Sequence, residues 1–172
     1  MLKSNDLINK VKSYNKFLNP ETLDKAYNFA VKAHENQKRH SGDPYVIHPV
    51  AVANILTELK LDSATIATGL LHDTIEDTHA TYQTIKQEFG QEVADLVEGV
   101  TKISELENQA KANSRAENFR KLIIATSKDI RVLLVKIADR LHNMRTIHSI
   151  DKQEKKESCL LYTSDAADER LR

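Results

Sequence analysis

The chain has 172 residues, of which 40% are hydrophobic and 29% charged, enough for one domain with a real core but too few for two full ones. Its 25 basic and 25 acidic residues balance, which excludes a global field for coating DNA, and no apolar run approaches the length of a membrane span. The single cysteine predicts a soluble protein of the reducing cytoplasm, and 4 glycines, 3 prolines and few alternating apolar runs favour an all-α fold.

Two helices are predicted at the N-terminus. Residues 5–17 carry apolar side chains at helical spacing, which predicts the first helix. Asn19 can cap a second helix, Pro20 suits its first turn and Glu21 is a favourable early acid, so this helix should continue to about residue 37. His34 lies near its end without a neighbouring ligand at helical spacing, and we interpret it as a helix-end histidine.

A basic loop comes next. Residues 38–45 contain Ser-Gly-Asp-Pro, which is typical of a loop, and three potentially cationic side chains. His48 follows at the start of a helix predicted over residues 49–59, where the helix N-terminus also favours anions. A solvated surface loop would have a similar composition, but this position indicates that the loop and His48 converge at one helix end.

The stretch 69–77 is the most unusual part of the sequence. Asp62 or Ser63 can cap a single helix that ends near residue 77. Four ionisable side chains share one broad face of that helix: His72, Asp73, Glu76 and Asp77. Leucine, isoleucine and alanine occupy the opposite arc, so the helix can bury one side and offer polar groups on the other. Gly69 falls on the polar face, where it leaves room for a close approach.

The middle of the chain is predicted to be scaffold. Residues 82–89 form a short helix that Gly90 stops, and residues 91–100 form another with apolar residues facing inward. Residues 101–111 are polar and contain no strong element. Residues 114–127 again have the apolar spacing of a helix.

A central helix is predicted over residues 130–146, because residues 130–138 are apolar on nearly every side and no glycine or proline occurs through residue 146. Asp139 emerges from it, and an unpaired buried charge would be very costly. A salt bridge to Arg140 or Arg145 is one explanation, but neighbours at i and i+1 do not face each other on a helix. A metal ion fits better. His142 and Asn143 lie on the same face as Asp139.

Taken together, two imidazoles and two carboxylates from three helices suit one divalent transition metal. These candidate ligands are His48, His72, Asp73 and Asp139. Glu76, one helical turn from His72, could accept or orient the proton of the attacking water, and Asp77 could position the nucleophile or the leaving group.

Three segments closely resemble the hydrolase domain of the RelA/SpoT proteins, which degrade ppGpp and pppGpp: residues 39–49, 72–77 and 136–146. The order His…His-Asp…Asp is that of the HD-domain metal phosphohydrolases. The resemblance extends over about residues 20–157, after an N-terminal helix in residues 1–19. It implies an HD-domain helical bundle with the metal site between its helices, a guanine nucleotide alarmone as substrate, and GDP or GTP plus pyrophosphate as products.

The resemblance also implies roles for individual residues. It assigns Mn²⁺ to the same four ligands, catalysis to Glu76 and Asp77, and a nucleotide pocket to a further set. That set consists of Arg39, His40, Ser41, Tyr45, Asn143 and Thr146. The position of His40 is often lysine in relatives. Residues 158–172 depart from the family and are interpreted as a non-native tail, and the synthetase and regulatory domains of longer relatives would be missing.

Two other functions remain open. An HD-type site could act on a different nucleotide, since the metal ligands alone specify phosphohydrolysis and little more. A non-catalytic alarmone-binding domain is the second alternative, although the sequence retains every expected ligand and both acidic residues.

Overall fold

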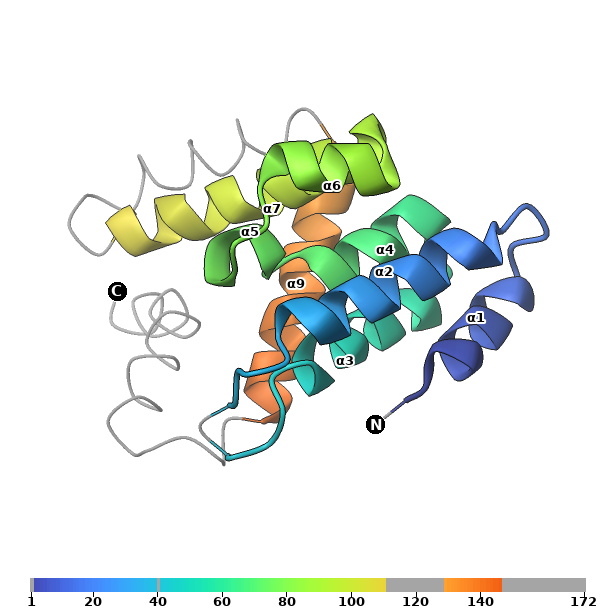
Figure 1. Ribbon diagram of the computed structural model, residues 1–172, viewed down its shortest axis with the longest axis horizontal. Coiled ribbons are helices and arrows are strands. Elements are labelled where there is room, and N and C mark those ends of the chain that lie inside the picture. The colour runs from blue at the N-terminus through green and yellow to red at the C-terminus, as the bar shows by residue number, and fades with distance from the viewer. Residues whose placement is uncertain (1, 40, 111–128, 147–172) are drawn as a thin grey trace, which may run out of the picture.

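The computed structural model describes residues 2–39, 41–110 and 129–146, with the backbone alone for residues 106–110. Within these ranges the chain forms helices and no strand, apart from an isolated bridge between Lys38 and Pro44 (Figure 1). The helices are α1 (Ser4–Lys12), α2 (Pro20–Ala33), α3 (Ile47–Glu58), α4 (Ser63–Leu71), α5 (Thr74–Asp77), α6 (Tyr82–Phe89), α7 (Gln91–Ala110) and α9 (Ile130–Arg145). The all-α prediction is confirmed.

Local capping residues start α2 and α4 where the sequence predicts, whereas α3 starts at Ile47, two residues before the predicted position, without a side-chain cap. The side chain of Asn19 accepts from the backbone N–H of Glu21 at 3.0 Å, at the start of α2. Asp62 accepts from the backbone N–H of Thr65 at 3.0 Å, at the start of α4. Gly90 ends α6 with a φ of 89°, a left-handed conformation that glycine adopts without strain.

Two helices end earlier than predicted. α1 stops at Lys12 instead of residue 17, and Phe17, which we expected on its apolar face, is exposed. α2 stops at Ala33. His34 is its C-terminal cap, as predicted, and its buried ring stacks on Tyr45 with centroids 4.8 Å apart.

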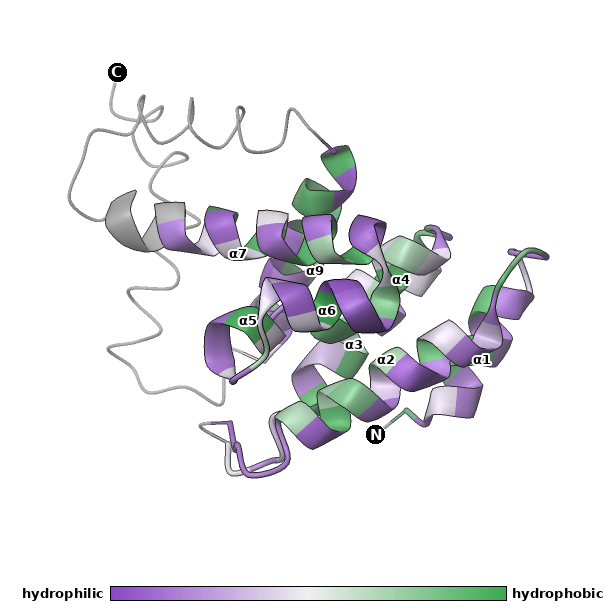
Figure 2. Cartoon of the chain, turned by 45° about the horizontal axis from the view of Figure 1, so that its top comes forward, coloured by the Kyte–Doolittle hydropathy of each residue, from purple (hydrophilic) through white to green (hydrophobic). Residues whose placement is uncertain are grey.

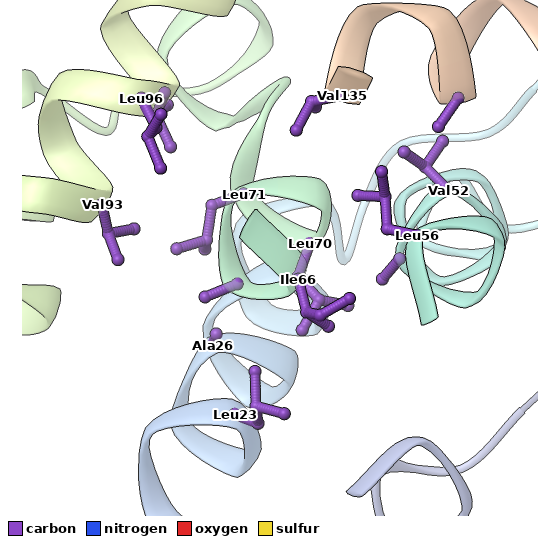
Figure 3. Close-up of a cluster of buried hydrophobic side chains, with 14 of the residues drawn as sticks. Leu23, Ala26, Val52, Leu56, Ile66, Leu70, Leu71, Val93, Leu96 and Val135 are labelled. Atoms are coloured by element: carbon purple, nitrogen blue, oxygen red, sulfur yellow. The ribbon is translucent and has the colours of Figure 1, made fainter. Parts of the chain in front are cut away.

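The centre of the fold is α4. Every residue from Thr65 to Leu71 is buried, and the helix packs against α2, α3, α7 and α9. Figure 3 shows Leu71 pointing to one side of α4, toward Val93 of α7, while Ile66 and Leu70 lie together on another side. The predicted two-sided helix is therefore wrong for this segment, because a helix surrounded on all sides offers no polar face.

The role of central helix was predicted for residues 130–146, and this is also wrong. α9 crosses behind α4, from α7 to α3 (Figure 1), and in the described part of the chain its buried residues lie on one face. Ile137 is 51% exposed and Leu141 is 40% exposed, so the apolar residues of α9 do not all contribute to the core of the described chain.

The helix predicted to run from residue 63 to 77 breaks at His72 and Asp73 into α4 and the short α5. At the break, two side chains form hydrogen bonds to backbone carbonyl groups. Thr74 Oγ1 donates to the Leu71 carbonyl at 2.6 Å, and His72 Nδ1 donates to the Gly69 carbonyl at 2.9 Å. Such local bonds compete with the backbone ladder of a helix. The consequence is that His72 and Asp73 lie in a turn at the end of the buried helix.

Gly69 allows a close approach, but the element that approaches is α3. A Cβ atom at this position would lie 2.6 Å from Leu56 Cδ1 and 3.2 Å from Ala53 Cα. The glycine thus brings α3 and α4 together, which sets the distance between the histidines that these helices carry.

The predicted end of a helix at residue 100 is wrong, because α7 continues to Ala110. In this extension Ile103 and Ser104 are buried, and Ser104 Oγ donates to the Val100 carbonyl at 3.3 Å. The predicted helix over residues 114–127 and the predicted tail over residues 158–172 lie outside the described residues.

The loop between α2 and α3 is mostly hydrophilic, in contrast to the apolar segments of α3 and α4 (Figure 2). In the described part of the chain, no helix has both the length and the apolar character that crossing a membrane requires.

Candidate metal centre

Three buried side chains from different helices meet at one point. His48 lies in the first turn of α3, His72 directly follows α4, and Asp139 lies in α9. One ligand atom from each lies within 4.8 Å of the others. Asp139 Oδ1 is 3.2 Å from His48 Nε2 and 4.0 Å from His72 Nε2. Because α4 packs against both α3 and α9, the core itself holds these three residues together.

Asp73 borders the same point. Its Oδ1 lies 3.0 Å from His72 Nε2, and its Oδ2 lies 3.5 Å from His48 Nε2. The hydroxyl of Tyr45 donates to Asp73 Oδ2 at 2.8 Å and lies 2.9 Å from Asp77 Oδ2. Burial and the charges of Asp73 and Asp77 raise the pKa of Tyr45, so its hydroxyl stays a donor.

The electrostatics of the cluster favour a cation. Burial opposes the charged form of His72, but the carboxylates of Asp73 and Asp139 outweigh it and raise the pKa of His72 to about 9. Burial also opposes ionisation of both carboxyls, yet the neighbouring histidines keep the pKa of Asp73 and of Asp139 well below the usual range. Burial lowers the pKa of His48. The cluster therefore holds two carboxylates that need a positive charge between them.

The donor set fits a divalent metal ion. Because His72 Nδ1 donates to the Gly69 carbonyl, its Nε2 is the nitrogen that faces the carboxylates; this buried atom lies 3.0 Å from Asp73 Oδ1, but among the described residues it has no partner in hydrogen-bond geometry. A buried polar atom without a partner is costly and calls for a specific explanation. Nitrogen and carboxylate donors of this kind suit zinc, iron and manganese.

A cavity of about 210 Å³ opens beside this cluster, and its lining is almost entirely polar. Its acidic wall consists of Asp73, Glu76, Asp77 and Asp139. Arg39 and Lys136 line the same cavity and are the two lysine or arginine side chains among its described lining residues. The Glu76 side chain is exposed by area, but its partial burial, followed by the charge of Asp73, raises its pKa, although a hydrogen bond to Ser104 opposes the shift. This raised pKa makes Glu76 a better proton acceptor than an ordinary glutamate.

The structure brings some of the predicted pocket residues together. Arg39, Tyr45 and Asn143 line the cavity, and Arg39 Nη2 donates to Asn143 Oδ1 at 2.9 Å. Ser41 and Thr146 are not among the lining residues: Ser41 Oγ donates to Asp43 Oδ2 at 2.8 Å, and Thr146 Oγ1 donates to the His142 carbonyl at 3.1 Å. His40 lies outside the described residues.

Sequence reasoning missed Lys136. Its Nζ donates to Asp139 Oδ2 and to Ser104 Oγ, both at 2.9 Å. The salt-bridge partner of Asp139 is thus neither Arg140 nor Arg145 but a lysine three residues earlier, a spacing that places both on one helix face. That spacing was available in the sequence, whereas Ser104 lies in a segment for which no helix was predicted.

His142 was also missed as a site residue. Its ring packs against His48, with their Nδ1 atoms 2.8 Å apart and their ring centroids 5.0 Å apart. Burial, followed by the charges of His48 and Arg39, lowers the pKa of His142 to about 4. His142 is therefore neutral at neutral pH.

A helical fold that gathers histidines and aspartates from three helices around one buried point defines a class of metal-site α proteins. A comparison of the sequence with models of known protein families agrees with this assignment. The chain belongs to the HD domain family, whose family model matches residues 26–164.

Individual relatives and a solved structure show which members of this family the chain resembles. The GTP pyrophosphokinase rsh of Brucella melitensis biotype 1 is 55% identical over 147 residues, which are 86% of this chain and 20% of that protein. The bifunctional (p)ppGpp synthase/hydrolase SpoT of Escherichia coli K12 is 58% identical over 128 residues, 74% of this chain and 18% of that protein. The chain thus spans about a fifth of the length of these curated relatives.

One similar solved structure is that of a metazoan ortholog of SpoT that hydrolyzes ppGpp. It has a TM-score of 0.63 and 27% sequence identity, and the match covers 80% of this chain and 79% of that one. The predicted resemblance to the RelA/SpoT proteins is confirmed by these matches.

Proposed function

We propose that this chain is a Mn²⁺-dependent hydrolase that removes the 3′-pyrophosphate of ppGpp and pppGpp. The observation that carries the proposal is the buried cluster of His48, His72 and Asp139, which adjoins a polar cavity that Glu76 and Arg39 also line. The relatives named for (p)ppGpp hydrolysis support this choice of substrate. We also propose that the HD unit spans residues 20–157 after an N-terminal helix, and that it works in the cytoplasm, as the cysteine usage predicts.

In this proposal the metal is held by His48, His72, Asp73 and Asp139. When bound, a divalent ion supplies hydroxide near neutral pH and polarises a phosphoryl oxygen. Affinity order alone would favour zinc over manganese for these donors, so the choice of Mn²⁺ rests on the resemblance to the RelA/SpoT proteins.

Residues of the chain carry out proton transfer, positioning and phosphate binding. Glu76 accepts a proton from the attacking water, whose oxygen forms a bond to the phosphorus attached to the 3′-oxygen. The bond between that phosphorus and the 3′-oxygen breaks, the 3′-oxygen takes up a proton, and pyrophosphate leaves. Tyr45 holds Asp73 and Asp77 in place through its hydroxyl, so that Asp77 can position the attacking or leaving group. Arg39, fixed by Asn143, provides a positive charge for the phosphates.

The test is product analysis on protein that has been freed of metal with a chelator and then reloaded with Mn²⁺. Anion-exchange chromatography should show GDP from ppGpp and GTP from pppGpp, each with an equal amount of pyrophosphate. Release of phosphate from deoxynucleotides with ppGpp left intact would instead support a different HD phosphohydrolase. Binding of ppGpp without turnover would support a non-catalytic binding domain, and activity restored by Zn²⁺ but never by Mn²⁺ would refute the choice of metal.

A further inference from the structure

The two ring nitrogens of His48 face different surroundings. Nε2 points toward the carboxylates, 3.2 Å from Asp139 Oδ1 and 3.5 Å from Asp73 Oδ2. Nδ1 lies on the opposite side of the ring, 2.8 Å from Nδ1 of His142. His142 is 9% exposed and lies on α9, one residue before Asn143. One nitrogen of His48 is thus available to a metal, and the other is committed to His142.

The contact between the two rings requires one proton between the two Nδ1 atoms. A neutral imidazole has one N–H and one lone pair, and a metal binds the lone pair. If Nε2 of His48 binds a metal, its proton must sit on Nδ1, and His48 is then the donor to His142. Nδ1 of His142 must carry a lone pair to accept it, which places the proton of His142 on its own Nε2.

A second donor agrees with this arrangement. Arg39 Nη1 lies 3.3 Å from the same Nδ1 of His142, and a guanidinium can only donate. Its other terminal nitrogen, Nη2, donates to Asn143 Oδ1. Arg39 therefore needs a lone pair on His142 Nδ1, just as a metal-binding His48 does. Two independent contacts assign the same tautomer to His142.

We propose that His142 is a positioning residue of the metal centre, which holds His48 in the tautomer and orientation that present Nε2 to the metal. His142 is not among the residues that line the cavity, so its effect on the metal would act through His48. Histidines that bind metals almost always donate their second N–H to an acceptor, and loss of that acceptor typically weakens metal binding about 10- to 100-fold. His142 supplies this acceptor for His48. Through Arg39 it also ties the loop before α3 to the metal ligand. The inference rests on the metal part of the proposed function but not on the identity of the substrate.

The experiment compares Mn²⁺ affinity in the full chain by isothermal titration calorimetry without substrate. Wild type, His142→Leu and His142→Asn are measured, with His79→Leu as the matched control, since His79 is exposed and is not among the residues that line the cavity. His142→Leu should weaken binding about 10- to 100-fold. His142→Asn, whose Oδ1 can accept at the position of Nδ1, should stay within about threefold of wild type, as should His79→Leu. Circular dichroism of the metal-free proteins identifies variants that fail to fold.

A spectroscopic measurement tests the tautomers directly. In the diamagnetic Zn²⁺-loaded wild type, the ¹⁵N shifts of the rings should show a protonated Nδ1 on His48 and a protonated Nε2 on His142. The opposite tautomers would overturn the inference, and so would wild-type affinity in the leucine variant or equal losses in the folded leucine and asparagine variants. A wild type that binds neither Mn²⁺ nor Zn²⁺ would overturn the metal site and this inference together. Metal binding without alarmone hydrolysis would overturn the proposed substrate alone.

Discussion

Replacing Glu76 by glutamine should separate catalysis from metal binding. Glu76 lines the cavity, but it is not one of the three residues whose donor atoms converge at the buried cluster. Glutamine has the same shape and can still bond to Ser104, but it cannot accept a proton. A general base contributes about 10² to 10⁴ to a rate, so kcat should fall by that factor, equivalent to about 3–5.5 kcal/mol in the activation barrier. Because Glu76 is exposed, the free energy of unfolding should change by less than about 0.5 kcal/mol.

The assay combines pyrophosphate release from ppGpp with metal content by inductively coupled plasma mass spectrometry. Glu88→Gln is the matched control: Glu88 forms an exposed ion pair with Lys25 at 2.8 Å, away from the cavity, and its loss should alter neither reading. Loss of metal from Glu76→Gln would show that Glu76 is a ligand. Turnover within about threefold of wild type with metal bound would show that Glu76 is not the base. Either result refutes the reasoning.

Four further predictions address the metal, the pH dependence of stability and of metal affinity, and packing. Asp139→Ala removes a carboxylate 2.9 Å from the largely buried Lys136 Nζ, so Mn²⁺ content and the free energy of unfolding should both fall, the latter by about 3 kcal/mol in urea titrations. The raised pKa of His72 stabilises the metal-free fold fully below its ordinary pKa of 6.5, and urea titrations should show this stabilisation lost as pH rises through about 9. The metal must displace the His72 proton, so Mn²⁺ affinity measured by calorimetry should rise about tenfold per pH unit between pH 7 and 9. Gly69→Ala places a Cβ atom 2.6 Å from Leu56 Cδ1, and thermal unfolding should show a loss of about 1–2 kcal/mol despite the better helix propensity; an unchanged melting temperature would contradict this packing argument.

The sequence was sufficient to predict where α2 and α4 start and that His48, His72 and Asp139 lie close to one another. Starts depend on local bonds, such as that from Glu21 N–H to Asn19, which a few adjacent residues determine. His48, His72 and Asp139 were associated by motif, and the structure places their donor atoms within 4.8 Å of one another.

The burial of whole helices could not be predicted in the same way. α4 is short and carries Thr65 and Thr68 among its apolar residues. Its pattern of polar and apolar residues therefore does not predict that four helices surround it. α9 is more apolar around its circumference, yet Ile137 and Leu141 are exposed in the described structure. The burial of a helix depends on which other helices pack against it, and these helices are distant in the sequence.

The partners of the site residues were missed for a related reason. Lys136 joins Asp139 on α9 to Ser104 on α7, and His142 joins His48 on α3 to Arg39 in the preceding loop. Each is one helical turn from Asp139, so spacing placed them near the site. Only the packing of α9 against α3 and α7 shows which side chain each one meets.

The metal-binding atoms come from three separate places: α3, the C-terminal end of α4, and α9. The stability of the fold should therefore depend on the supply of metal. No unfolded chain holds His48, His72 and Asp139 at one point, so an ion bound by all three would bind only after these helices have docked. Such a ligand shifts the folding equilibrium by mass action, and at a free concentration of about a thousand times its Kd it adds about 4 kcal/mol to the free energy of unfolding. Depletion of the metal would then shorten the lifetime of the protein as well as stop its chemistry.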